Sequence, residues 1–160
     1  MKKQNFKTPA QSAVESRYLI MPHQANPQGT AFGGVIMAWI DMVASMAAQR
    51  HCGKEVVTVS IDSLSFEEPI YIGDHVVLKA MVNYVGRTSM EVGVQVVRED
   101  PTSNKKIIAT TAHLTFVALD KNKKPTPVEP ITPQTDDEKR HYQNAQVRVK
   151  ARKELLSKIR

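Results

Sequence analysis

One segment restricts the fold more than any other, the run VIMAWIDMVASMAAQR at residues 35–50. Its Ala, Met and Ile residues favour a helix, and no Pro or Gly interrupts it over about four turns. Apolar residues go nearly all the way round this helix, which is typical of a helix buried in a core. Its alanines would let a sheet approach closely. We therefore expect one long central helix packed closely against a sheet.

The rest of the core predicts strands that follow one another along the chain. Pro, Gly, Asn and Ser mark the turns between runs that alternate or are rich in β-branched residues. The expected strands are residues 15–21, 56–66, 75–85, 88–98 and 105–119. Tight turns between consecutive strands imply an antiparallel sheet. The fold class is thus α+β, with a curved antiparallel sheet wrapped around one helix and its edges and outer face left to partner subunits.

Composition changes along the chain divide it into four parts. We expect a flexible N-terminus at 1–14, a folded domain at 15–120, a Pro-rich linker at 121–135 and a charged tail at 136–160. The tail has eight Lys or Arg and four Asp or Glu, so it carries most of the net charge of +6. Within it, residues 148–159 predict a helix whose thin apolar contact consists of Val149, Leu155, Leu156 and Ile159.

Composition also excludes several classes of protein. The single cysteine, Cys52, rules out an intramolecular disulfide and fits a reducing compartment, and its neighbour His51 would point elsewhere on a helix. No apolar run has the length of a signal peptide or a membrane span, so we expect a cytoplasmic protein that does not enter a membrane. The basic tail lacks any accompanying nucleic-acid-binding motif, and we expect no nucleic-acid partner.

Asp41 is the anomaly of the central helix. Burying a carboxylate costs several kcal/mol unless it is paired, and Asp is a poor residue for a helix interior. One interpretation is structural, with Asp41 accepting hydrogen bonds from backbone donors or an Arg. The other is functional, with Asp41 as a base or nucleophile. Ser45, one turn later on the same face, could help to hold a water molecule, although a core serine more often bonds back to its own helix.

The loop before the helix contains two further candidates. Gly33 and Gly34 would expose backbone N–H groups at a helix N-terminus, where an oxyanion or a phosphate can bind, or they could simply allow a tight turn. Asn26 could polarise a carbonyl or position water, but in a loop rich in Pro and Gly an asparagine is also a common turn former. These residue types alone leave both interpretations open.

A resemblance to a known family adds to this interpretation. The run NPQGTAFGG at 26–34, followed by WID at 39–41, resembles the signature of the hotdog-fold acyl-CoA thioesterases. The similarity continues in residues 56–76 and 84–96 and covers about 15–119. It is strongest to the short single-domain bacterial acyl-CoA hydrolases related to the cytosolic brain-type enzyme. The spacing of Asn, Gly-Gly and Asp is its specific part.

The resemblance implies that Asn26 and Asp41 are catalytic, with Asn26 of one subunit facing Asp41 of the other in a dimer, and dimers often assembled as trimers. It implies that N–H groups of Gly33 or Gly34 bind the thioester oxygen. Asp41 would activate water or attack to form an anhydride. The turn formed by Gly86, Arg87, Thr88 and Ser89 would contact coenzyme A. Fatty acyl-CoA is then the substrate, coenzyme A the product, and no separate cofactor or metal is required.

Two features of the sequence qualify this resemblance. The family usually has an acidic residue or Thr just before its Asn, where this chain has Gln24 and Ala25; we interpret this as tuning of the site. His23 and the tail cations Lys150, Arg152 and Lys153 could add polar contacts or simply be solvated.

The alternative functions on this fold are a non-catalytic acyl-CoA-binding or regulatory module, which need not keep Asp41, and a dehydratase, which normally uses His with an acid.

Overall fold

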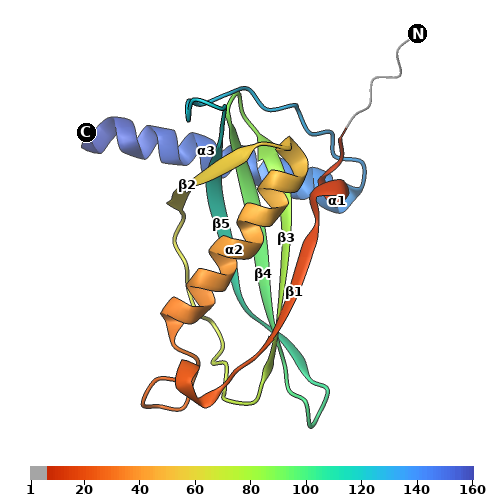
Figure 1. The fold of residues 1–160 in the computed structure, drawn as a ribbon, viewed down its shortest axis with the longest axis vertical. Coiled ribbons are helices and arrows are strands. Elements are labelled where there is room, and N and C mark those ends of the chain that lie inside the picture. The colour runs from red at the N-terminus through yellow and green to blue at the C-terminus, as the bar shows by residue number, and fades with distance from the viewer. Residues whose placement is uncertain (1–6) are drawn as a thin grey trace.

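The computed structural model describes residues 7–160 as an α+β fold of one curved sheet with a helix on each face (Figure 1). The helices are α1 (Pro9–Ser12), α2 (Gly33–Cys52) and α3 (Asp136–Ile159), with a short 3-10 turn η1 (Pro22–Gln24). The strands are β1 (Val14–Leu19), β2 (Glu55–Ile61), β3 (His75–Val85), β4 (Ser89–Glu99) and β5 (Lys106–Leu119). Within 7–160, no helix is long and apolar enough to cross a membrane.

The five strands form a single antiparallel sheet in the order β1-β3-β4-β5-β2. Register shifts interrupt three of its strand pairs, between Thr58 and Ser60, between Val82 and Tyr84, and between Val96 and Val97. Such irregularities increase the local twist, and this lets the sheet curl around α2. The expected hotdog architecture, with a curved sheet around one long helix, is confirmed.

The α2 helix packs into the concave face of the sheet along one side only. Ile36, Ile40 and Val43 on this side are almost fully buried, and Gly53 ends the helix in the left-handed conformation with φ of 62°. The opposite side is exposed to solvent in the single chain, and Met42 on this side is 49% exposed. The expectation of a helix buried on all sides is therefore wrong for a single chain. Its apolar open side suits a subunit contact, which a sequence pattern cannot separate from a core contact.

The ends of several elements differ from expectation. The first strand ends at Leu19, and β2 ends at Ile61. Residues 62–69 continue as coil and are held to β5 by hydrogen bonds from the Asp62 N–H to the His113 carbonyl at 2.9 Å and from the Glu67 N–H to the Ala109 carbonyl at 3.0 Å. Part of the expected flexible N-terminus is folded: α1 lies at 9–12, and the buried Ser12 hydroxyl accepts a hydrogen bond from the Val82 N–H at 2.9 Å. Residues 1–6 lie outside the described part.

The C-terminal helix α3 begins at Asp136, twelve residues before the helix expected at 148–159. Thr135 and Glu138 form a capping box, and three acidic residues in the first turn suit the helix dipole. The Thr-x-x-Glu pattern is visible in the sequence and could have predicted this start. The preceding linker is also packed in part, since Val128 and Ile131 are buried.

Candidate active site

The loop between η1 and α2 is organised by the side chain of Asn26. Its Oδ1 accepts hydrogen bonds from the backbone N–H groups of Gln28 and Thr30, both at 3.1 Å. Its Nδ2 donates to the Thr30 hydroxyl at 2.8 Å. Asn26 thus acts as a turn former within its own chain, and the turn holds its amide in a fixed position.

Asn26 and Gly33 line one cavity of about 240 Å³ at the start of α2. The other wall comes from residues 66–70, which include the aromatic ring of Phe66 and the carboxylate of Glu68. The structure therefore brings together two residues that the sequence singled out, Asn26 and Gly33. Glu68 is an additional polar group of this cavity and was not among the candidates from the sequence.

Gly33 and Gly34 are the first two residues of α2, so their N–H groups have no acceptor within the helix. No hydrogen bond from either N–H is found among residues 7–160. A Cβ on Gly34 would lie 2.7 Å from the Phe32 ring, and one on Gly33 would touch Phe66 at 3.4 Å. Two free N–H donors at the positive end of a helix dipole can bind an anionic oxygen.

Asp41 lies on α2 about 12 Å beyond Gly33 at 1.5 Å per residue, on the open side of the helix. Its Oδ1 accepts a hydrogen bond of 2.8 Å from the hydroxyl of Thr58 on β2. Asp41 is half-buried and does not line the cavity that contains Asn26. A single chain thus does not bring Asn26 and Asp41 together.

Thr58 is a site residue that sequence reasoning missed. In β2 the side chains of Val56, Thr58 and Ser60 are the less exposed set, while Val57 and Val59 are exposed. The more apolar side of the strand therefore faces away from α2, the reverse of what alternation predicts. The sequence did contain a signal for this site. Thr58 and Ser60 are polar residues on the helix side of an otherwise apolar strand, and that side faces the one carboxylate of the central helix, Asp41.

The turn from Gly86 to Ser89 joins β3 to β4 and is closed by a hydrogen bond of 2.8 Å from the Gly86 N–H to the Ser89 carbonyl. Thr88 lies between them, and its carbonyl accepts from the Ala118 N–H at 3.0 Å. Arg87 is exposed and forms no ion pair within the described residues. The turn lies at the end of β3 away from the Asn26 loop, so one chain does not bring these two elements together (Figure 1).

Other polar candidates form hydrogen bonds to backbone carbonyls of their own chain. The Ser45 hydroxyl donates to the Met42 carbonyl at 2.7 Å, so it can only accept from a water molecule. The Cys52 thiol faces the Lys54 carbonyl, whereas His51 is buried against the Glu129 carbonyl at 2.8 Å, and burial lowers the pKa of this histidine. Cys52 and His51 therefore do not form a catalytic pair.

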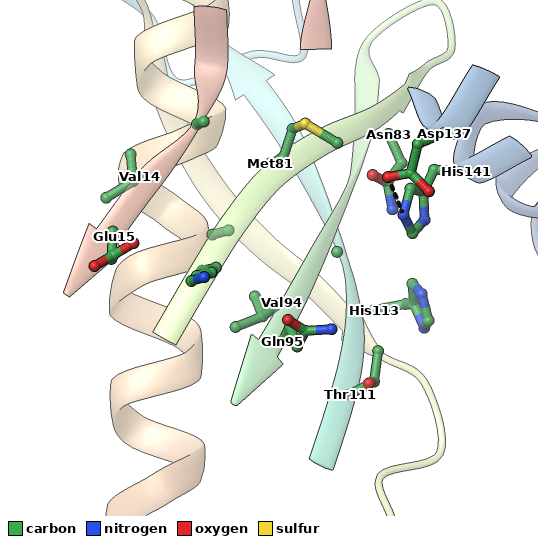
Figure 2. Close-up of a pocket in the computed structure, with 14 residues that line it drawn as sticks. Val14, Glu15, Met81, Asn83, Val94, Gln95, Thr111, His113, Asp137 and His141 are labelled. Atoms are coloured by element: carbon green, nitrogen blue, oxygen red, sulfur yellow. Dashed lines mark ion pairs between the residues drawn. The ribbon is translucent and has the colours of Figure 1, made fainter. Parts of the chain in front are cut away.

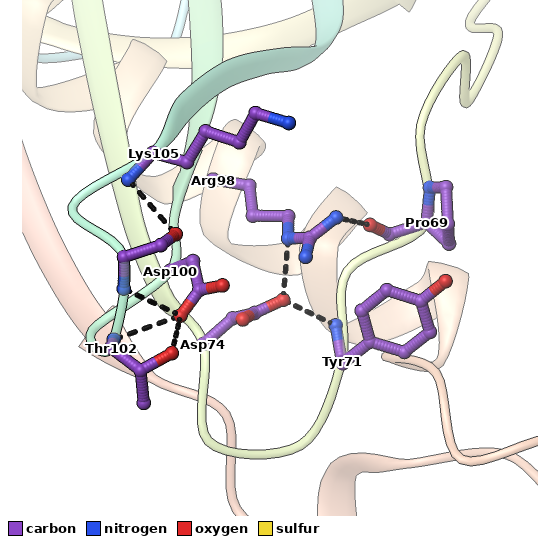
Figure 3. Close-up of polar contacts among 8 residues, drawn as sticks. Pro69, Tyr71, Asp74, Arg98, Asp100, Thr102 and Lys105 are labelled. Atoms are coloured by element: carbon purple, nitrogen blue, oxygen red, sulfur yellow. Dashed lines mark hydrogen bonds and ion pairs between the residues drawn. The ribbon is translucent and has the colours of Figure 1, made fainter.

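A polar cluster behind the Asn26 cavity holds the turn at residues 69–74 (Figure 3). Arg98 on β4 binds the Asp74 carboxylate at 2.8 Å, and that carboxylate accepts from the Tyr71 N–H at 2.7 Å. The backbone of Tyr71 in turn forms an isolated antiparallel β-bridge with Thr30 in the Asn26 loop. The loop is thereby fastened to the sheet through Arg98, a positioning role that sequence reasoning did not identify.

A second group of charged residues lies between α3 and the outer face of the sheet. Arg148 binds the buried Glu91 carboxylate, with a shortest distance of 2.6 Å, and Arg152 binds Asp62 at 2.7 Å. Burial raises the pKa of Glu91, and the bonds from Arg148 oppose this rise. Burial, with the nearby charge of Arg148, lowers the pKa of His113 to about 4.

His113 and the buried Asn83 line a cavity of about 440 Å³ on this outer face (Figure 2). His141 and Asp137 of α3 close one side of it, and the His141 Nε2 lies 3.4 Å from the Asp137 carboxylate. These residues are separated from Asp41 and Gly33 by the sheet, so the cavity is distinct from the candidate active site.

Comparisons with known proteins agree on the class that this architecture and polar set define. The family model of the thioesterase superfamily matches residues 28–105. An acyl-CoA thioester hydrolase of Bacillus subtilis is 42% identical over 143 residues, which are 89% of this chain and 83% of the relative. The chain belongs to the thioesterase superfamily, among the acyl-CoA thioester hydrolases.

Solved structures support the same assignment. An acyl-CoA hydrolase from Staphylococcus aureus, in complex with butyryl coenzyme A and coenzyme A, has a TM-score of 0.90 and 40% identity, covering 96% of this chain and 93% of that one. An acyl-CoA hydrolase from Bacillus cereus has a TM-score of 0.91 and 41% identity, with 96% of each chain covered. A hexameric acyl-CoA thioesterase has a TM-score of 0.91 and 38% identity, covering 96% and 97%.

The Staphylococcus aureus enzyme has also been solved as three single-residue variants, at an asparagine, an aspartate and a threonine. The spacing of these three residues along that chain equals the spacing of Asn26, Asp41 and Thr58 here.

Proposed function

We propose that this protein hydrolyses fatty acyl-CoA to a free fatty acid and coenzyme A, at a site formed by Asp41 of one subunit and Asn26 of another. One observation carries the proposal. The Asp41 carboxylate is oriented by the Thr58 hydroxyl on the uncovered side of α2, where it remains accessible to a second chain. A purely structural carboxylate would be saturated by donors of its own chain.

The chemistry requires few groups because a thiolate leaves readily. The N–H groups of Gly33 and Gly34 would stabilise the oxyanion that forms as the thioester carbonyl becomes tetrahedral. Asp41 would remove a proton from the attacking water, or attack the carbonyl itself to form an anhydride. The Asn26 amide, fixed by its own turn, would orient the carbonyl or the water.

The site requires two subunits because each chain separates its parts. Asp41 lies about 12 Å from Gly33 along α2 and outside the cavity of Asn26. The exposed methionines of α2 and the open edge of β2 supply an apolar contact and unpaired strand hydrogen bonds for a dimer. We propose a trimer of such dimers, which agrees with the hexameric state of related thioesterases.

Coenzyme A would bind at the turn from Gly86 to Ser89. Arg87 presents a free guanidinium there, the group best suited to phosphate oxygens. No further cofactor is part of the proposal. A cytoplasmic location is part of it and rests on the single thiol, Cys52, which fits a reducing compartment.

The first test measures thiol release from acetyl-, butyryl- and palmitoyl-CoA with a thiol-reactive dye. Asp41→Asn and Asn26→Ala should each lower turnover by at least about two orders of magnitude. No turnover at any chain length, with coenzyme A still bound, would instead indicate a non-catalytic binding module. Full activity of Asp41→Asn would contradict the catalytic role of Asp41.

The second test uses mixed subunits to locate the site. In a hybrid dimer of Asp41→Asn and Asn26→Ala chains, one of the two shared sites regains both native residues. Random exchange of two inactive variants should then restore about a quarter of wild-type activity in a two-fold dimer. A site contained within one chain predicts no recovery, and a mixture of Asp41→Asn with itself is the control.

A further inference from the structure

The face of α3 that contacts the sheet forms a continuous stripe. Ala145 is fully buried on it, Arg148 reaches Glu91 of β4, and Arg152 reaches Asp62 just after β2. These positions repeat every three or four residues, the spacing of one helix face. The helix thus crosses the sheet from β3 to its edge strand β2, as Figure 1 shows from the other side.

The same stripe continues after the sheet of this chain has ended. Leu155, Leu156 and Ile159 follow Arg152 at the same spacing, yet they are 58%, 37% and 68% exposed. Residues 153–159 extend about 10 Å at 1.5 Å per residue, roughly the width of two more strands. The helix therefore presents a sheet-facing apolar surface where its own chain provides no sheet. We name residues 153–159 the α3 overhang.

The edge strand β2 has a matching unpartnered surface. Val57, Val59 and Ile61 are 45%, 59% and 37% exposed, and they alternate with the residues that face α2. They therefore lie on the outer face of the sheet, the face that α3 crosses. Both apolar surfaces are exposed in the single chain, and the contact between Arg152 and Asp62 places the start of the overhang at the end of β2.

We propose that each α3 overhang packs on the outer face of β2 in the partner subunit, so that the two helices clasp the dimer from outside. This rests on the dimer of the proposed function, joined along β2. Extension of the sheet by a second copy puts the partner's β2 directly beneath the overhang. A two-fold axis makes the contact reciprocal, so both chains bury both surfaces.

The positions of the charges favour a second copy over a membrane surface. Leu155, Leu156 and Ile159 continue the stripe already used for a sheet, whereas Lys150 and Lys158 lie on other sides of the helix. A helix that inserts into a membrane would present its apolar side away from the protein. Here that side faces the plane of the sheet.

Cysteine cross-linking tests the proposal in a Cys52→Ser background. Ile159→Cys chains with a size tag are mixed, after subunit exchange, with untagged Val57→Cys, Val59→Cys or Ile61→Cys chains and oxidised mildly. A disulfide needs Cα atoms closer than about 7 Å, so a mixed-size band reports direct contact between subunits. We expect this band with at least one β2 variant. Val147→Cys, exposed on another side of α3, is the matched control and should give none.

Truncation provides a second measurement. A chain ending at Arg152 keeps the Glu91 and Asp62 contacts but lacks the overhang, and its dimer should dissociate at a concentration at least about tenfold higher. Absence of every Ile159→Cys band, or assembly unchanged by truncation, overturns the proposal. Loss of binding to phosphatidylglycerol vesicles with unchanged assembly would assign the overhang to a membrane. Since catalysis is measured separately, an active enzyme with no cross-link refutes the contact between the α3 overhang and β2 of the partner subunit and leaves the proposed function intact.

Discussion

On the concave face of the sheet, Asp41 receives one side-chain hydrogen bond, from Thr58, and remains open to a second chain. On the convex face, Glu91 receives three contacts from the Arg148 guanidinium and is 2% exposed. Both carboxylates are at least partly buried against the sheet. The difference lies in how completely their own chain satisfies them.

This difference separates two uses of a costly polar group. A carboxylate saturated by its own chain fixes a helix onto a sheet and has little capacity left for a ligand. A carboxylate held at one oxygen is oriented and can still accept a proton or attack. The distribution of donors, more than burial itself, therefore distinguishes the group that we assign to catalysis.

Parallel amide substitutions give the largest expected effect and could break this comparison. Asp41→Asn should lower turnover at least about one-hundredfold with little change in Tm, because it removes a base and keeps the shape. Glu91→Gln should lower Tm and keep most of the turnover, because it leaves Arg148 without its counter-charge. Thiol release and thermal unfolding measured on both variants decide the outcome. A Glu91→Gln enzyme with the activity loss of Asp41→Asn would erase the distinction.

Arg148→Met tests the convex face alone. Removing the guanidinium leaves the Glu91 carboxylate buried without a partner, which should cost about 3 kcal/mol of unfolding free energy. Urea unfolding measures this change. The exposed Lys150 on the same helix is the control, and Lys150→Met should stay within about 0.5 kcal/mol. Equal effects of the two substitutions would mean that the buried pair contributes nothing specific.

Arg87→Ala tests the proposed coenzyme A contact. Loss of an exposed charge that binds phosphate should raise KM for acyl-CoA about fivefold with kcat unchanged, and the effect should shrink in high salt. Steady-state kinetics at two ionic strengths provide the measurement. Lys121→Ala, an exposed cation in a neighbouring turn, should leave KM unaltered. A fall in kcat would instead give this turn a role in chemistry.

His113→Gln should have the smallest effect, visible only in acid. The pKa of His113 is lowered to about 4 from the ordinary 6.5, so between these values the unfolded chain binds more protons than the folded one. Stability from the neutral imidazole is complete above pH 6.5 and is lost as the pH falls towards 4. The Tm of the wild type should fall faster over this range than that of the variant. Parallel Tm curves would contradict the assignment.

Local patterns predicted most of the architecture. The helix at residues 35–50 became α2 with two extra residues at each end, and the hairpin at Gly86 and Arg87 lies where the alternation placed it. The side on which α2 is open could not be read from its sequence, since an apolar residue at a subunit contact looks the same as one in a core. The start of α3 was readable from Thr135 and Glu138 but was obscured by the high charge of that segment.

Only some parts of the candidate site could be predicted from the sequence. Asn26 and Gly33 lie close in the chain, and the structure brings them to one cavity. Asp41 was notable as a charge in an apolar helix, but its bond to Thr58 depends on strand β2 facing its polar side inward. The pairing of Asn26 with Asp41 stays a prediction, because it depends on a second chain.

The Thr58 hydrogen bond has a consequence for how the enzyme would behave on dilution. Thr58 belongs to the edge strand that we expect to join two subunits, so the strand that orients the Asp41 carboxylate is itself steadied by assembly. When the protein is diluted, its specific activity should therefore decrease before the subunits unfold. Cellular abundance of the chain would then set its catalytic efficiency as well as the number of enzyme molecules.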